Sequence, residues 1–89
     1  MKKFRQLEAI VKGFSNHRRI EILTLLEKTP NLSLSEISEV LGVNFKTVAE
    51  HTRRLTIAGL VMKWNVGAAV HHAVAPVGRV VLKFLRTLE

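Results

Sequence analysis

Apolar residues recur at intervals of three and four along the first half of the chain, which is the period of amphipathic helices. A first helix is predicted over residues 2–14, where Gly13 and the following Ser15-Asn16 pair interrupt the pattern. Ser15 and Asn16 both have side chains suited to a helix N-cap, so a second helix is predicted from there to about Lys28. Its expected core residues are Ile20, Leu23 and Leu26.

The stretch "SLSE" carries the signature of another helix start. Ser33 and Glu36 have the spacing of a capping box, in which each side chain binds a free backbone amide of the other residue. A short helix is therefore predicted over residues 34–41, with Gly42 as its left-handed stop. Its expected core contacts are Ile37, Val40 and Leu41.

A further helix follows directly after this stop. Asn44 is its predicted cap, and the helix runs to about Ala58, before Gly59. Two helices joined by a tight turn that holds a glycine form a helix-turn-helix.

After Gly59 the period of the apolar pattern changes. The stretches "LVMKWNV" and "AVHHAVA" are rich in valine and partly alternating, and they flank Gly67, which predicts a two-stranded hairpin. The turn "VGAA" lacks the Asn-Gly or Asp-Gly pair that would fix the register. Pro76 closes the hairpin, and a last helix is predicted over residues 77–88. One face of that helix carries Val77, Val81, Phe84, Leu85 and Leu88.

Together the elements predict an α+β fold of about five helices and one hairpin, in a single domain over residues 1–89. The terminal segments 1–14 and 77–89 carry more apolar residues than a core of this size can cover. We therefore expect them to form the interface of a homodimer.

The helix over residues 44–58 has an apolar side and a charged side. At about 100° per residue, Val48, Thr52 and Leu55 face inward, with His51 at the edge. The outward side and its flanks hold Lys46, Thr47, Ala49, Glu50, Arg53, Arg54 and Ile57. Cations three or four residues from Glu50 stabilise even a merely solvated helix, by about 0.2–0.5 kcal/mol a pair. The same face also suits DNA, because Arg and Lys bind guanine edges in the major groove.

Charge favours the DNA interpretation. Fourteen Lys and Arg residues stand against seven acidic residues, all of them Glu, which gives a net charge of +7. An excess of this size is typical of proteins that bind a polyanion, and a helix-turn-helix followed by a hairpin can dock a helix into double-stranded DNA. The predicted DNA contacts are Asn44, Lys46, Thr47, Glu50, Arg53, Arg54, Arg18, Arg19 and Lys63.

Arg18 and Arg19 lie in the first turn of the second helix, where the helix dipole disfavours cations. Two compensations are open. Either Glu21 or another carboxylate pairs with them, or they bind DNA phosphate.

The stretch "NHRRIEILTLLEKTPNLSLSEISEVLGVNFKTVAEHTRRLTIAGLV" resembles an ArsR-type winged helix-turn-helix transcription regulator. The closest similarity lies at Leu41-Gly42, Thr47-Val48, His51, Leu55 and Ala58-Gly59-Leu60-Val61. "HAVAPVGRVVLKFL" is similar to the strand and helix that end ArsR- and MarR-type proteins. The resemblance covers residues 16–85 or so. It implies a winged-helix fold with the hairpin as its wing, and a homodimeric regulator that binds double-stranded DNA.

The chain also departs from this family's pattern. The family's serine in the recognition helix is Ala49 here, its next basic residue is Glu50, and its leucine after the histidine is Thr52, so base preference does not carry over. Metal-sensing members use cysteines before the turn, or histidines and carboxylates on the last helix. This chain has no cysteine, and its last helix has no histidine, so we expect no metal sensing. A small-molecule effector stays open.

The remaining polar and aromatic residues have less specific signals. His71 and His72 are adjacent on a strand, so they face opposite sides and do not favour a metal site. His51 is expected to pack or hydrogen-bond at the core edge, with a phosphate contact as the alternative. Trp64 is expected in the core or an interface. The tip "NVGAA" has no cation, which predicts a weak minor-groove contact.

The chain has none of the residue combinations that catalysis requires, such as Ser-His-Asp or paired carboxylates, so we expect neither an enzyme nor a cofactor. No apolar run reaches the eighteen residues needed to cross a bilayer, and we expect a cytoplasmic protein without a membrane partner. Two alternatives to a sequence-specific regulator remain. One is a nonspecific, chromatin-type nucleic-acid-binding protein, and the other is a winged-helix protein-interaction module.

Overall fold

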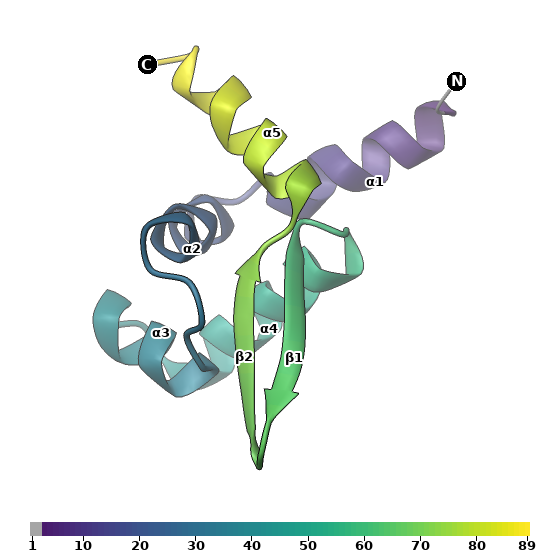
Figure 1. Ribbon diagram of the computed structural model, residues 1–89. Coiled ribbons are helices and arrows are strands. Elements are labelled where there is room, and N and C mark those ends of the chain that lie inside the picture. Colours follow the sequence, from purple (N-terminus) through teal and green to yellow (C-terminus); the bar gives the residue numbers. More distant parts are fainter. Residues whose placement is uncertain (1–2) are drawn as a thin grey trace.

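The computed structural model describes residues 3–89 and contains five helices and one two-stranded sheet within that range (Figure 1). The elements are α1 (Phe4–Phe14), α2 (His17–Lys28), α3 (Leu34–Leu41), α4 (Phe45–Ile57), β1 (Val61–Val66), β2 (Ala69–Val74) and α5 (Pro76–Arg86). Their order and type confirm the predicted fold class. Lys2, assigned to the first helix from the sequence, lies outside the described residues.

Asparagine side chains begin two of the helices. The Oδ1 atom of Asn16 accepts hydrogen bonds from the backbone amides of Arg18 at 2.9 Å and Arg19 at 3.3 Å, so Asn16 rather than Ser15 caps α2. Asn44 caps α4 in the same way, through two amides of its first turn. Because these bonds satisfy otherwise free amides, they fix where each helix starts.

The capping box of α3 is present as predicted. Ser33 Oγ accepts from the amide of Glu36 at 3.2 Å, and Glu36 Oε1 accepts from the amide of Ser33 at 2.9 Å. Gly42 ends the helix at a φ of 65°, the left-handed region that glycine adopts at little cost. The Ser38 hydroxyl then donates to the Val43 carbonyl oxygen at 2.6 Å, which holds the turn between α3 and α4.

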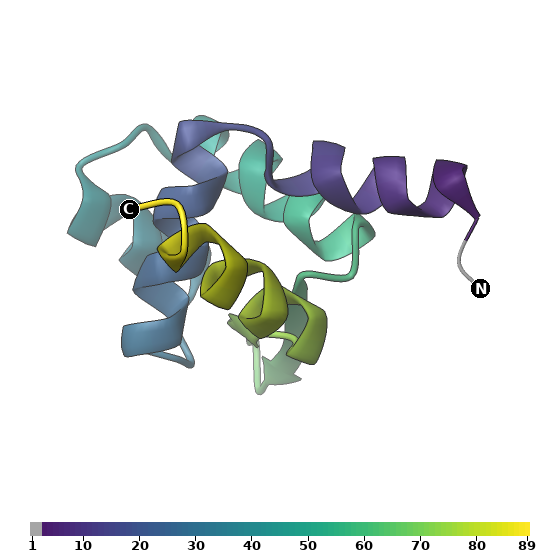
Figure 2. The ribbon, with the colours of Figure 1, turned by 90° about the horizontal axis from the view of Figure 1, so that it is seen from above.

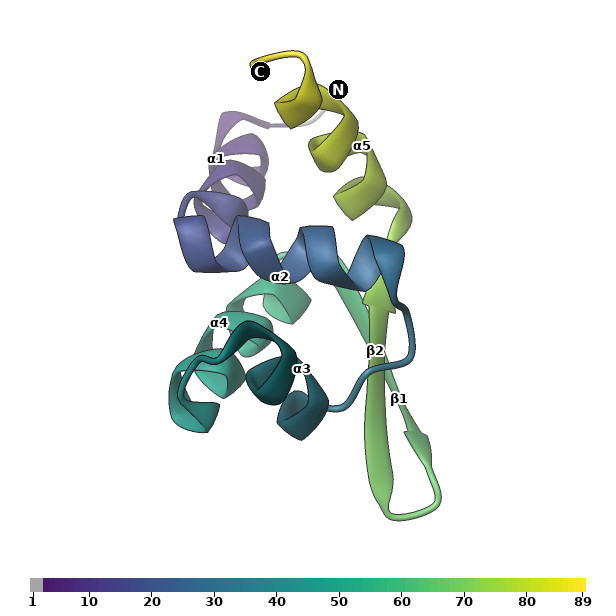
Figure 3. The same cartoon turned by 90° about the vertical axis from the view of Figure 1, so that its left-hand side faces the viewer.

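The core lies where α2, α3, α4 and the base of the hairpin meet, with α5 packed over one end (Figure 3). Its residues are Ile22, Leu23, Leu26, Ile37, Val48, Leu55, Leu60, Val61, Val74, Val81 and Leu82. Two predicted core positions are wrong. Ile20 is only partly buried, because it lines the edge between α2 and α5, and Ile22 faces the core instead. Val40 is 61% exposed, because the inner side of α3 is centred on Ile37 and Leu41.

Gly13 does not interrupt the first helix, as the sequence pattern had suggested, but lies inside α1 and is buried. A Cβ atom at this position would overlap the side chain of Ala58. The glycine therefore allows α1 to approach the C-terminal end of α4, where Figure 2 shows the two helices side by side.

The hairpin has a defined register, in which Val61 pairs with Val74 and Val66 with Ala69. Its two-residue turn begins with Gly67 at a φ of 62°, which matches the primed turns that suit twisted strands. Leu32 forms an isolated bridge with His72, which ties the base of the hairpin to the loop between α2 and α3. The rest of the hairpin projects beyond the helices as a wing (Figures 1 and 3).

Helices α1 and α5 lie on the side of the molecule opposite the wing tip (Figure 1). The predicted apolar face of α5 is divided: Val81 is buried and Leu85 partly so, while others point to solvent. The large exposed apolar residues of the two helices are Phe4, Leu7, Val11, Val77, Val80 and Phe84, and Leu88, just after α5, is exposed as well. Within residues 3–89, no helix is long and apolar enough to cross a membrane.

Candidate nucleic-acid interface

Helix α4 divides into the two faces expected from the sequence. Val48, Thr52 and Leu55 are buried against the body. Lys46, Thr47, Glu50, Arg53, Arg54 and Ile57 are exposed. The helix is held at its start by the cap at Asn44 and the turn from α3, and at its other end by packing against α1. Its outer face is therefore fixed in position and open to solvent.

Glu50 organises two of the cations on this face. Its carboxylate accepts hydrogen bonds from Nε and Nη2 of Arg53, both at 3.0 Å, and from Nε of Arg54 at 2.9 Å. These bonds, led by those of Arg53, lower the pKa of Glu50 to about 2, and they raise the pKa of Arg53. Within the described residues Lys46 makes no salt bridge, so it is the cation of this face that no carboxylate restrains.

Arg18 and Arg19, at the start of α2, have different surroundings. Arg18 Nη1 binds Glu21 Oε1 at 3.0 Å, which is the carboxylate pairing foreseen as one alternative. Arg19 instead connects three helices, because its Nη1 donates to the Lys12 carbonyl oxygen at 3.0 Å and its Nε donates to His51 Nδ1 at 3.1 Å. Arg19 therefore has a structural role where α1, α2 and α4 meet.

His51 is partly buried at the edge of the core, as predicted. Burial, followed by the positive charge of Arg19, lowers the pKa of His51, so its ring is neutral at neutral pH. Since Nδ1 accepts the hydrogen bond from Arg19, the ring proton is on Nε2. This bond was not foreseen, because 32 residues separate its two partners.

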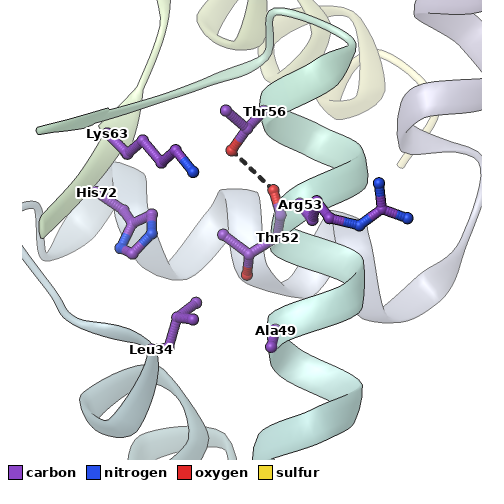
Figure 4. A pocket seen from close by; sticks show the side chains of 7 residues that line it. All are labelled: Leu34, Ala49, Thr52, Arg53, Thr56, Lys63 and His72. Carbon is purple, nitrogen blue, oxygen red and sulfur yellow. Dashed lines mark hydrogen bonds between the residues drawn. The ribbon is translucent and has the colours of Figure 1, made fainter. Parts of the chain in front are cut away.

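Lys63 lies on β1, directly across the hairpin from His72, and both side chains face α4 (Figure 4). His72 is buried while His71 stays partly exposed, which confirms that the adjacent histidines face opposite sides. The ring of Trp64 packs edge-on to His71, with centroids 6.4 Å apart, on the other side of the hairpin.

A hollow of about 220 Å³ separates the hairpin from α4. The residues that line it are Leu34, Ala49, Thr52, Arg53, Thr56, Lys63 and His72. Sequence reasoning had placed Thr52 in the packed interior, and nothing local indicated that its side chain would border a hollow.

The model of the winged helix-turn-helix DNA-binding family matches residues 15–62, which span α2, both helices of the helix-turn-helix and the start of β1. The chain belongs to the winged helix-turn-helix DNA-binding family. By its position α4 is the second helix of the helix-turn-helix, and the hairpin occupies the place of the wing. No curated protein sequence matches the chain significantly.

Solved structures of winged helix-turn-helix regulators have the same fold. The homodimeric DNA-binding domain of Mb0332 from Mycobacterium bovis, a possible ArsR-family regulator, has a TM-score of 0.84 and 22% identity, over 94% of this chain and 78% of that one. An ArsR-like regulator from Rhodococcus sp. RHA1 has a TM-score of 0.77 and 29% identity, over 96% and 75%. FabT from Streptococcus pneumoniae, solved in complex with DNA, has a TM-score of 0.72 and 19% identity, over 80% and 52%. The resemblance to ArsR-type winged helix-turn-helix regulators is thereby confirmed.

Proposed function

We propose that this protein is a transcription regulator that binds specific double-stranded DNA sequences as a homodimer. The observation that carries the proposal is the outer face of α4, where Lys46, Arg53 and Arg54 are exposed on a helix whose inner face is buried. A helix of this kind fits the major groove of DNA, and its N-terminal part contacts base edges.

The position of each side chain along α4 suggests its role. Lys46 and Thr47 lie in the first turn, so we assign them to base edges, and Asn44, just before them, is a further DNA contact of this end of the helix. Arg53 and Arg54 lie two turns further on and reach either bases or flanking phosphates once Glu50 releases them. Lys63 is the wing's contribution, and Arg18 is a phosphate contact from α2. Nε and Nη1 of Arg19 already bind groups within the protein, so Arg19 can contact DNA only through its remaining N–H donors.

The homodimer part of the proposal is supported by the exposed apolar residues of α1 and α5. The two helices and Leu88, just after α5, together expose seven large apolar side chains, and both helices lie away from the wing tip (Figure 1). Mb0332, which has the same fold, was solved as a homodimer. A two-fold dimer implies a near-palindromic operator, with half-sites about one helical turn, ~10–10.5 bp, or a multiple of it apart.

The two alternatives are separated from this proposal by a binding experiment. Fluorescence anisotropy with genomic DNA fragments, in the presence of excess unrelated DNA, should identify fragments that the competitor does not displace. From a nonspecific nucleic-acid-binding protein, the competitor would displace all fragments equally. A protein-interaction module would bind every fragment weakly.

Salt dependence provides the second arm of this experiment. A dimer that neutralises about six to ten phosphates should lose ~10³–10⁵ in affinity between 50 and 200 mM salt, because each contact releases counterions. An affinity that stays constant over this range would exclude DNA as the main partner.

A regulator of this kind acts where the DNA is, so we also propose a cytoplasmic location.

A further inference from the structure

Thr52 carries a buried hydroxyl that has no hydrogen-bond partner, the sole buried side-chain polar atom of this kind within residues 3–89. The residue is 2% exposed. Two other helical threonines satisfy their hydroxyls on the carbonyl four residues earlier: Thr24 on Ile20 and Thr56 on Thr52, both at 2.8 Å. Thr52 does not use this bond, so its hydroxyl is free for another partner. A buried hydroxyl without one is unfavourable for folding.

The side chain of Thr52 borders the hollow between α4 and the wing, where polar groups converge from two elements (Figure 4). Thr52 and Thr56 approach from α4, and Lys63 and His72 approach from the facing side of the hairpin. Arg53 also lines the hollow, but its guanidinium points away from it (Figure 4).

The polar groups that line the hollow are suited to an anion. The Nδ1 atom of His72 donates to the carbonyl oxygen of Leu32 at 2.9 Å, so Nδ1 carries the proton and Nε2 is an acceptor, which pairs with a ligand's hydroxyl such as the P–OH of hydrogen phosphate. Lys63 makes no salt bridge within the described residues, and no carboxylate is among the residues that line the hollow. The donors available to an anion are thus the ammonium of Lys63 and the hydroxyl of Thr52.

We propose that this hollow is a binding site for one oxyanion, a phosphate or carboxylate group whose oxygens accept from Lys63 and Thr52, with Nε2 of His72 as the acceptor for a phosphate hydroxyl where the ligand has one. Its volume of about 220 Å³ is below the ~300–1,000 Å³ of sites for drug-sized ligands and suits a small group. The oxyanion comes either from a free small molecule or from a phosphate of the DNA backbone. In the second case the inference rests on the proposed function. In both cases the bound group connects the wing to the recognition helix.

Inorganic phosphate is the probe for the test. Titrated into the full chain at constant ionic strength against a chloride reference, it should shift the NMR signals of Thr52, Lys63 and His72 saturably. Thr52→Val and Lys63→Gln should each weaken phosphate binding by about tenfold or more, since each removes one hydrogen bond to a charged ligand. The matched controls Thr24→Val and Lys28→Gln should leave it unchanged.

Stability separates the ligand role from a structural one. Thr52→Val removes an unpaired hydroxyl and keeps the side-chain shape. The melting temperature of the ligand-free variant should therefore equal or exceed that of the wild type, while its affinity for phosphate falls. Absence of a saturable shift, or equal phosphate affinity in wild type and Thr52→Val, would overturn the proposal.

A DNA duplex then identifies the source of the oxyanion. Competition between duplex and phosphate, with Thr52→Val weakening all sequences alike, assigns the site to the DNA backbone. Simultaneous binding of duplex and phosphate assigns it to a free ligand. If phosphate fails to bind while DNA affinity depends on the α4 cations, this inference fails and the proposed function stands. If the chain binds phosphate at this site but does not bind DNA, this inference stands and the proposed function fails.

Discussion

Glu50 binds Arg53 through two parallel hydrogen bonds, from Nε to Oε1 and from Nη2 to Oε2, each 3.0 Å long. The same carboxylate binds Arg54. Two of the three cations on the outer face of α4 are therefore held in place, and partly neutralised, before DNA arrives. Their release is part of the cost of binding.

Glu50→Gln should raise DNA affinity severalfold for all sequences, because it frees two guanidiniums from exposed ion pairs, which are individually weak. Anisotropy titrations on cognate and unrelated duplexes measure this. Glu8→Gln is the control, since Glu8 also pairs with a cation of its own helix, Lys12, and its loss changes the net charge equally. A changed base preference in Glu50→Gln would instead mean that Glu50 reads a base, such as a cytosine amino group.

The ionisation of Glu50 gives a second test, in the free protein. The hydrogen bonds from Arg53 and Arg54 lower the pKa of Glu50 from its ordinary value of 4.5 to about 2. A lowered pKa favours the folded state above pH 4.5, and this contribution is lost as the pH falls toward 2. The side-chain carboxyl signal of Glu50 should titrate near pH 2 by NMR, and Arg53→Gln should move its midpoint upward. A wild-type midpoint near 4.5 would show that the pairs do not form in solution.

The contact of Gly13 with Ala58 predicts an inverted effect of alanine. Alanine normally stabilises a helix by about 1 kcal/mol over glycine. Gly13→Ala should instead destabilise the protein by ~1–3 kcal/mol, because the new methyl group overlaps Ala58 where α1 meets α4. Thermal and urea unfolding measure the change. Adding Ala58→Gly should restore much of the stability, and a double variant as unstable as Gly13→Ala would contradict the packing.

The parts of this structure that were predictable from sequence are those with local causes. The Ser33 and Glu36 capping box, Gly42 and Asn44 fix helix ends through groups a few residues away, so their roles are predictable from spacing. For α2 the spacing leaves both Ser15 and Asn16 as caps, and the structure shows that Asn16 is the cap. The outer face of α4 followed from helical period alone.

The parts that were missed depend on partners distant in the chain. Gly13 was interpreted as a helix interruption because Ala58 lies 45 residues later, and Ile22 was passed over for Ile20 because the direction of α2 is set by α5 and the hairpin. The hollow at Thr52 also depends on distant residues, since Lys63 and His72 come from the hairpin. The hydrophobic pattern of the sequence shows which residues of a helix or strand face inward, but not which residues of other elements they contact.

The proposed dimer interface can be tested with one pair of valines. Val80 on α5 is 67% exposed and Val40 on α3 is 61% exposed, so both tolerate a charged replacement equally well in the monomer. Val80→Glu should shift the protein to monomer in sedimentation and weaken DNA binding, because it places a charge among the exposed apolar residues of α5. Val40→Glu should leave the association state unchanged. Dimers that persist in Val80→Glu would place the interface elsewhere.

The most direct test of the account removes the three cations of α4 together. The triple variant Lys46→Ala, Arg53→Ala, Arg54→Ala should be compared, at one stated salt concentration, with a control of equal charge change. Arg5→Ala, Lys28→Ala, Lys83→Ala is such a control, since these residues are exposed on α1, α2 and α5. Because α1 and α5 carry the proposed dimer interface, sedimentation must show that the control and the α4 variant both keep the association state of the wild type. Circular dichroism establishes that both variants fold.

If α4 is the recognition helix, the α4 variant should lose at least about a hundredfold in affinity for the cognate duplex, because base and phosphate contacts cost ~1–3 kcal/mol each when removed. The control should lose far less. Equal affinities in the two folded variants would mean that the outer face of α4 is only solvated, and would contradict the proposed function.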